Sequence, residues 1–150
     1  MVRIKAYYAD WVRGPLGDAA GKADNQKNVE LACMRYNYLR NLLGWYIYCP
    51  HEHEDVVSAG WKTAVSSDQI LNLCCAVVLC CDIFIVGGDP KYSSGVRTEM
   101  TVAEKGGLVI WQAWPLLERV EYLANHEEKI LSAARQTEAD ARNAKSYQVV

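Results

Sequence analysis

Glu99 is the residue best suited to chemistry, because its spacing predicts a carboxylate on the buried face of a helix. The segment 94–105 carries apolar residues at helical spacing, and Glu99 lies three residues from Val96 and four from Ala103. A buried carboxylate costs free energy unless it is paired or used. A buried strand precedes this helix, so we expect Glu99 near the carboxyl ends of parallel strands, where α/β sheets bind ligands.

Two serines precede the same helix. Ser93 and Ser94 suit its N-cap, where a hydroxyl accepts a hydrogen bond from the first turn. Amides at a helix start also bind anions, so a phosphate site is an additional role for the serines. Glu99 has a structural alternative as well, because it can neutralise the helix dipole or pair with Arg97 or Arg13.

Aromatic side chains are candidates for stacking on a ligand. Trp11 and Tyr92 fall in expected loops and suit this role best. Tyr7 and Tyr8 lie in an expected strand, so they either contact a ligand in the same way or belong to the core.

His51 follows Pro50 at the end of an expected strand, where it can contact a ligand. His51 and His53 alternate and so share one face, but no third ligand of clear spacing accompanies them, and we expect no metal site. Four of the six cysteines crowd into residues 74–81 without a C-x-x-C pattern. We expect buried thiols in a reduced, cytoplasmic protein, with redox or metal chemistry as the alternative.

The composition indicates one folded domain over residues 1–150. Hydrophobic residues make up 51% and charged residues 23%, which excludes a disordered chain. A net charge of −2 without a lysine and arginine cluster argues against a nucleic acid polymer as partner. The longest apolar run, 70–86, is interrupted by Asn72 and Asp82 and falls short of the roughly 20 apolar residues of a bilayer span. We expect neither a membrane segment nor a signal peptide.

Strands alternate with helices along the chain, which predicts crossover connections and a parallel sheet. The prediction is a three-layer Rossmann- or flavodoxin-like α/β domain with four to five strands, helices on both faces and strand order 2-1-3-4. Strands are expected at 3–8, 45–49, 83–86 and 108–111, and helices at 25–43, 68–80, 94–105 and 115–134, the first capped by Asp24 or Asn25.

Loops 9–24, 50–66 and 87–94 are expected to meet in one cleft beside Glu99. The helix after Pro115, part of a C-terminal extension over 115–144, has an apolar stripe without an evident internal partner, which predicts a dimer or larger homo-oligomer.

Several short motifs in order resemble the nucleoside 2-deoxyribosyltransferase-like superfamily, including its small phage-associated branch. They are YYADWVRG, the spacing N-x-x-N-x-x-x-A from Asn25, GWYIYCPH, CDIFIVGG, SSG, the glutamate and A-x-x-x-G, and they extend over about residues 2–111. The resemblance implies a fold of this class, no cofactor, and a pocket completed by a neighbouring subunit.

The resemblance also implies an activity on nucleosides or nucleotides. Glu99 matches the nucleophile that forms a glycosyl ester, and Ser93, Ser94 and Gly95 match the phosphate site of relatives that hydrolyse deoxynucleoside 5′-monophosphates. Other expected ligand contacts are Tyr8, Asp10, Trp11, Arg13, His51, Asp68, Asp89, Tyr92 and Arg97.

The chain departs from the family pattern at the acid that assists the leaving base. That acid lies eight residues before Asp82, where this chain has Cys74, and Asp68 would replace it only in a different helix register. Ser93 stands where the transferases have an aspartate. Two classes of function therefore stay open, an N-glycosidase or deoxyribosyltransferase and a non-catalytic nucleotide-binding protein that senses or sequesters its ligand.

Overall fold

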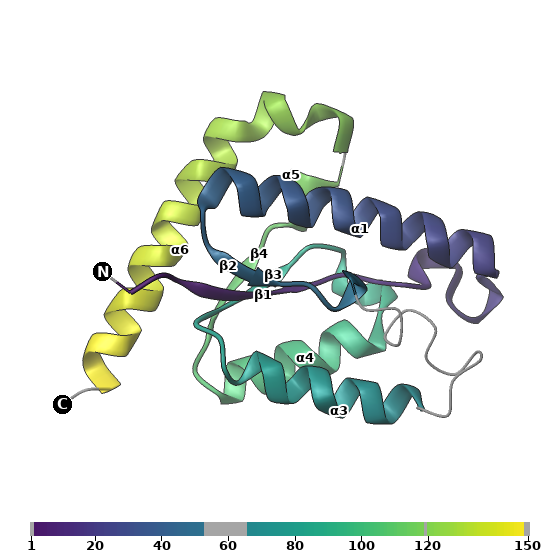
Figure 1. Cartoon of the computed structure of the whole chain (residues 1–150), viewed down its shortest axis with the longest axis horizontal. Helices are drawn as coiled ribbons and strands as arrows, with labels where there is room; N and C mark the ends of the chain where they lie inside the picture. Colours follow the sequence, from purple (N-terminus) through teal and green to yellow (C-terminus); the bar gives the residue numbers. More distant parts are fainter. Residues whose placement is uncertain (1, 53–65, 119, 149–150) are drawn as a thin grey trace.

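The computed structural model describes residues 2–52, 66–118 and 120–148. Its centre is a four-stranded parallel sheet with the order β2-β1-β3-β4, which confirms the predicted order (Figure 1). In register, Ala6 lies opposite Ile47 on one side and Ile83 on the other. The strands are β1 (Lys5–Ala9), β2 (Tyr46–Tyr48), β3 (Ile83–Val86) and β4 (Val109–Gln112).

Helices cover both faces of this sheet, so the predicted three-layer α/β architecture is confirmed (Figure 1). One face packs against α1 (Lys22–Leu43) and α6 (Glu127–Gln148), and the other against α3 (Ser67–Val78) and α4 (Ser94–Lys105). Strand β3 lies between the layers, and all four of its side chains are buried. A continuous apolar run such as this is typical of a strand covered on both faces. The shorter helical segments are η1 (Gly14–Ala19), η2 (Pro50–Glu52), η3 (Pro90–Tyr92), α5 (Trp114–Leu117) and η4 (Val120–His126).

The helix ends follow local capping chemistry. Ser93 caps α4, because its Oγ accepts a hydrogen bond from the Val96 amide at 3.2 Å, as expected. The predicted start of α1 is wrong, since the cap is Gly21 and the Asp24 carboxylate accepts from the Gly21 amide at 2.8 Å. An acidic residue at the third helical position stabilises a helix start as a reciprocal cap, which explains why Asp24 lies inside the helix.

The C-terminal segment differs most from expectation. Instead of one helix over 115–134, the chain forms α5, η4 and then α6, which continues to Gln148. The prediction that its apolar stripe lacks an internal partner is wrong, because α1 packs against β2 while α6 packs against β3 and β4. Side chains of this stripe are buried in the same core as Ile83, Ile85 and Trp111, namely Leu123, Ile130 and Ala134, and Leu116 packs against that core. Oligomerisation stays a prediction, but the apolar stripe no longer supports it.

Two contacts fasten α6 to the start of the sheet. The Arg142 guanidinium donates to the Val2 carbonyl at 3.0 Å, and Lys145 Nζ lies 2.6 Å from Asp82 Oδ1. The second carboxylate oxygen of Asp82 accepts from the Lys5 amide at 3.0 Å. Asp82 is therefore the structural acceptor between strands that its position before β3 suggests. Among the residues that the structure describes, no helix is long and apolar enough to cross a membrane.

Candidate functional site

Glu99 lies in the second turn of α4 and faces the sheet. Only 8% of its surface is exposed, and it shares the buried side of the helix with Val96 and Ala103. The three residues follow the three- and four-residue spacing that the sequence predicts for an inward face. The buried position of this carboxylate was thus predictable from the pattern alone.

The carboxyl group of Glu99 has a set of protic neighbours from other elements. Tyr7 of β1 and Cys74 of α3 interact with it electrostatically, as does Tyr48 of β2. Tyr7 Oη and Glu99 Oε2 are both buried, and neither has a hydrogen-bond partner within 3.5 Å among the described residues. Native proteins rarely leave buried polar atoms in this state, and strain, a catalytic role or a bound water or ion accounts for the exceptions.

Burial changes the acid–base properties of this cluster. It raises the pKa of Glu99 from 4.5 to about 7, and the nearby Tyr7 hydroxyl acts in the opposite direction. Burial also raises the pKa values of Tyr7 and Cys74, so both stay protonated at neutral pH. The cluster therefore holds one carboxyl group that titrates near neutrality between two neutral donors, a property that is enriched at active sites.

The sequence did not select Tyr7 and Tyr48 as neighbours of Glu99. Alternation along β1 was the available signal, because Tyr7 and Ala9 point to the α3 and α4 side while Tyr8 points to the α1 side. Cys74 was identified only as the residue at the position of the missing acid. Its thiol does lie beside Tyr7 and Glu99.

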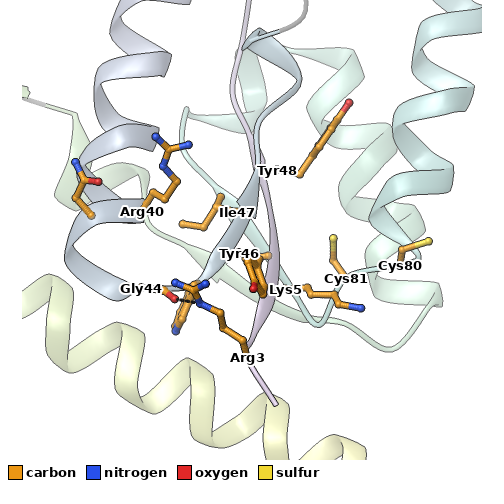
Figure 2. A pocket seen from close by; sticks show the side chains of 12 residues that line it. Arg3, Lys5, Arg40, Gly44, Tyr46, Ile47, Tyr48, Cys80 and Cys81 are labelled. Carbon is orange, nitrogen blue, oxygen red and sulfur yellow. Dashed lines mark hydrogen bonds between the residues drawn. The ribbon is translucent and has the colours of Figure 1, made fainter. Parts of the chain in front are cut away.

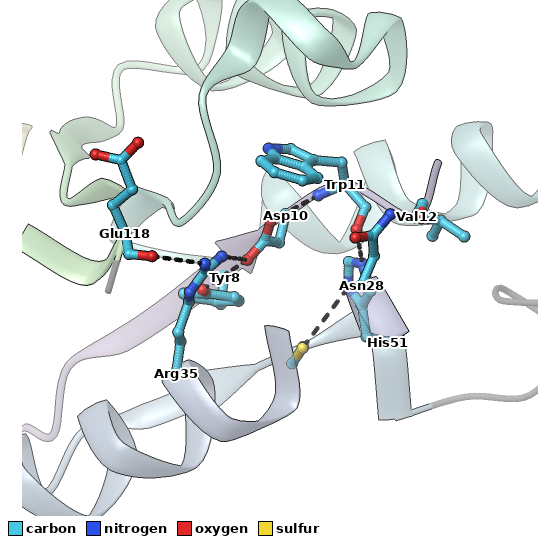
Figure 3. Close-up of polar contacts among 9 residues, drawn as sticks. Tyr8, Asp10, Trp11, Val12, Asn28, Arg35, His51 and Glu118 are labelled. Carbon is cyan, nitrogen blue, oxygen red and sulfur yellow. Dashed lines mark hydrogen bonds and ion pairs between the residues drawn. The ribbon is translucent and has the colours of Figure 1, made fainter. Parts of the chain in front are cut away.

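A second polar cluster lies at the end of β1 around Asp10, which is 7% exposed. The Asp10 carboxylate accepts from Tyr8 Oη and from the Trp11 amide, both at 2.8 Å, and pairs with Arg35 at 3.4 Å (Figure 3). The Arg35 guanidinium also donates to the Glu118 carbonyl at 3.3 Å. Arg35 was not predicted, although a basic residue three positions after buried Ala32 was a usable signal. Tyr8 and Asp10 are therefore parts of a buried network.

His51 ties this network to the end of β2. Its Nε2 lies 3.2 Å from the Trp11 carbonyl, which can only accept, so Nε2 carries the proton (Figure 3). Its Nδ1 faces the Cys49 sulfur at 3.9 Å. Burial lowers the pKa of His51, which favours the neutral ring. His51 is therefore buried, and its ring connects the loops that follow β1 and β2.

Trp11 and Tyr92 do meet, which joins the loops after β1 and β3. Their rings lie 5.9 Å apart at 69°, an edge-to-face contact, and Tyr92 is 39% exposed. Gly88 permits this arrangement, because a Cβ there would lie 2.0 Å from Trp11 Nε1 and 2.3 Å from Asp10 Oδ1. These two aromatic rings are the predicted stacking residues that the structure brings together.

The start of α4 is more occupied than the anion-site prediction assumed. The Val96 amide donates to Ser93 Oγ, and the Ser93 amide donates to the Pro90 carbonyl at 3.2 Å. Two of the four amides from Ser93 to Val96 are thus used internally. At the other two positions, Ser94 is exposed and Gly95 is half-buried.

Arg97 and Asp89 help to build the η3 turn beside this helix. The Arg97 guanidinium donates to the carbonyls of Pro90 and Lys91, at 2.9 Å each. Asp89 accepts from the Lys91 amide at 3.1 Å and pairs with its ammonium group at 3.5 Å. These contacts explain both residues structurally, and they leave Ser94 and Gly95 as the open part of the helix start.

Two other predicted contacts lie on the surface. Asp68 is exposed in the first turn of α3, and six helical positions put it about 120° around the axis from Cys74. It therefore does not share the inward face with the thiol. Arg13 is exposed immediately before η1. The expected contribution of loop 50–66 lies largely outside the described residues, apart from 50–52 and Ser66.

An open groove of about 750 Å³ lies along the outer edge of β2, toward the amino ends of the strands (Figure 2). Arg3, Lys5 and Arg40 line it beside the end of α1. Arg3 donates through Nε to the Gly44 carbonyl and lies 4.2 Å from the Tyr46 ring centre. Cations near helix C-termini neutralise the dipole there, so these charges have a structural cause. Helix α4, which carries Glu99, begins instead at the carboxyl ends of the strands.

No protein-family model, curated protein or solved structure matches this chain. Within the described ranges, no group of three or more histidine, cysteine, aspartate or glutamate side chains is arranged to hold a metal ion.

Proposed function

We propose that the protein cleaves the N-glycosidic bond of a nucleoside or nucleotide, by hydrolysis or by transfer of the deoxyribosyl group, with Glu99 as nucleophile. One observation carries the proposal: the Glu99 side chain is buried, and its Oε2 has no hydrogen-bond partner within 3.5 Å among the described residues. Burial also raises the pKa of this group to about 7. The resemblance of the motifs around Glu99 to the deoxyribosyltransferase-like superfamily supports the same reaction.

The proposed reaction has two steps at Glu99, and the neighbouring side chains assist them. The Glu99 carboxylate attacks the anomeric carbon, the bond from that carbon to the base nitrogen breaks, and the base leaves with the electron pair. The resulting glycosyl ester then reacts with water or with a second base, which restores the carboxylate. The protonated Tyr7 hydroxyl stabilises the ionised form of Glu99 before attack. The rings of Trp11 and Tyr92 offer a surface for the base.

The test is incubation of the full chain with a panel of nucleosides and nucleoside 5′-monophosphates, followed by chromatography of released base. Glu99→Gln keeps the shape of the side chain but removes the nucleophile, so turnover should fall by at least about 10³-fold with binding nearly intact. Glu104→Gln on the exposed side of α4 is the matched control and should retain activity. Equal base release by the Glu99→Gln and wild-type proteins would exclude Glu99 as the nucleophile.

A second candidate function is nucleotide binding without turnover. The observation in its favour is Cys74, a neutral thiol beside Glu99 where the family pattern has an acid. A protonated thiol with a raised pKa donates a proton to a departing base poorly. This alternative predicts thermal stabilisation by an intact nucleotide without released base. Cys74→Asp should then create or increase base release, whereas Cys80→Asp at an exposed position should not.

A further inference from the structure

Two helices of the same layer present different surfaces to solvent. Helices α3 and α4 lie side by side on one face of the sheet (Figure 1). The exposed residues of α4 are polar or charged, namely Ser94, Arg97, Thr98, Thr101, Glu104 and Lys105. From residue 69 onward, those of α3 and of the two residues after it are uncharged, namely Gln69, Asn72, Leu73, Ala76, Leu79 and Cys80. A solvated helix face usually has the composition of α4.

These six uncharged residues form one surface, which we call the outer face of α3. They follow one another at helical spacing, and the two largest apolar side chains, Leu73 and Leu79, are 60% and 57% exposed. The inner face of the same helix carries Cys74 and Val78, which are buried in the core. Helix α3 is thus apolar on two sides, whereas a helix of this kind is normally buried on both.

We propose that the outer face of α3 is the interface of a homodimer. In this dimer the α3 helices of two copies pack antiparallel across a two-fold axis that passes beside Ala76. The proposal is independent of the reaction assigned to Glu99. It also uses a different surface from the stripe of the C-terminal segment, which is buried within the chain.

The charge pattern favours a second copy as the occupant of this face. Residues 69–81 include no charged side chain. At a two-fold axis a surface faces its own copy, so a charge close to the axis would meet a like charge. An uncharged apolar face avoids this repulsion. A helix that binds an anionic membrane carries lysine or arginine beside its apolar face, and residues 66–81 contain neither.

The order of the residues along α3 also suits an antiparallel pair. With Ala76 beside the axis, it faces its own copy, and Leu73 faces the partner's Leu79. The same register brings Asn72 opposite the partner's Cys80. The small Ala76 side chain allows the two helices to approach at the lower end of the usual interaxial range of about 8–10 Å. The large apolar side chains then lie on either side of the closest approach.

The size of the surface predicts a reversible dimer. Helix α3 has 12 residues and is therefore about 18 Å long, while a stable interface buries about 800 Å² on each partner. The helix alone is short for such an interface. The apolar surface continues past its end, because Cys80 and Cys81 line the same groove as Tyr46, which is 58% exposed (Figure 2). We expect association that depends on concentration.

The first test measures the mass of the full chain by sedimentation equilibrium at a series of concentrations up to about 100 µM. We expect a monomer–dimer equilibrium for the wild-type protein. Leu73→Glu should weaken it at least about tenfold, because each copy would place a carboxylate against the partner's Leu79. Thr101→Glu, at an exposed position of α4 in the same layer, is the matched control and should dimerise as wild type does.

A cross-link tests the axis itself. Ala76→Cys in a Cys80→Ser background should form an intermolecular disulfide on mild oxidation, because position 76 faces its own copy. Thr101→Cys in the same background should not. In the wild-type protein Cys80 lies four helical positions from the axis, so two copies of it are about 12 Å apart along the helices. That separation exceeds the roughly 7 Å limit between Cα atoms for a disulfide, and we expect no Cys80–Cys80 bond.

Four results would overturn the proposal. They are a wild-type protein that stays monomeric at about 100 µM, a dimer that Leu73→Glu does not weaken, a cross-link through position 101 in place of 76, and wild-type protein that floats with anionic vesicles as a monomer. The last would identify the face as a membrane contact. Leu73 is exposed, so Leu73→Glu should keep the monomer fold, which circular dichroism checks. The cross-link decides the proposal even if that variant fails to fold.

Discussion

Asp10 and Glu99 are two buried carboxylates of almost equal exposure, 7% and 8%, with opposite environments. Asp10 is paired by a guanidinium, a phenol and a backbone amide, whereas Glu99 has an oxygen without any such partner among the described residues. A buried charge that is paired connects the elements that carry the two partners. A buried carboxyl group without such a pair has a raised pKa, because burial disfavours its charged form. Equal burial thus leaves the two carboxylates in different surroundings: Asp10 is paired with a guanidinium, whereas at Glu99 the Tyr7 hydroxyl only partly offsets the effect of burial on the pKa.

The largest expected effect tests the structural side of this comparison. Asp10→Ala removes the partner of buried Arg35 and of Tyr8, so the free energy of unfolding should fall by about 3–5 kcal/mol. Urea denaturation measures it. Asp140→Ala on the exposed side of α6 should change stability by no more than about 0.5 kcal/mol. Equal effects of the two substitutions would mean that the Asp10 network does not stabilise the fold.

The next effect concerns stability against pH at Glu99. Its pKa is 4.5 in the unfolded chain and about 7 in the fold. Below pH 4.5 the group is protonated in both states and does not change the free energy of unfolding. As pH rises from 4.5 through 7, Glu99 ionises in the unfolded chain before it ionises in the folded protein. The free energy of unfolding therefore decreases by about 3 kcal/mol over this window. Stability curves of wild type and Glu99→Gln should diverge over this window in favour of the variant. Parallel curves would contradict the raised pKa.

The same ionisation of Glu99 that lowers stability should raise activity. Only the ionised carboxylate is a nucleophile, so kcat/KM should rise about tenfold per pH unit below a midpoint near 7 and level off above it. The measurement is base release across pH 5 to 9 with the best substrate of the panel. A rate that is constant over this range would show that ionisation of Glu99 does not control the reaction.

The smallest effect refines the role of Tyr7. Its hydroxyl is the neighbour that lowers the pKa of Glu99 against the effect of burial. Tyr7→Phe should therefore move the midpoint of the pH–rate profile upward while the fold is kept. Tyr8→Phe, on the other face of β1, removes a hydroxyl bonded to Asp10 and should leave that midpoint in place. A downward shift in Tyr7→Phe would reverse the assigned interaction.

The fold was predictable because its signals are local. Apolar runs such as Ile83–Val86, followed by Gly87 and Gly88, define a buried strand and its turn, and strict alternation with helices leaves few topologies. The candidate nucleophile was predictable for a similar reason, since the spacing of Glu99 from Val96 and Ala103 is a property of one helix. Sequence patterns therefore sufficed for this strand and for the position of Glu99, whose neighbours in space are also neighbours in the chain.

The remaining features depend on contacts between distant segments. Arg35 and Asp10 are 25 positions apart, and nothing in the pattern around either residue specifies that they pair. His51 was predicted as a ligand contact, and nothing in the sequence around it indicates that its Nε2 pairs with the Trp11 carbonyl of another loop. The stripe of the C-terminal segment appeared free because α1 covers less of the sheet than its length suggests. These errors concern the partner that a side chain finds, whereas the predicted start of α1 and the single helix over 115–134 were errors about the elements themselves.

Helix α6 has a consequence for how the protein is made. A ribosome synthesises all four strands before residues 127–148, so the α1-side surfaces of Ile83, Ile85 and Trp111 emerge without the helix that buries them. Lys145, which fastens the end of α6 to Asp82, comes later still. A nascent chain that already holds every strand therefore presents an uncovered apolar surface, the kind of surface that chaperones bind and that aggregation exploits.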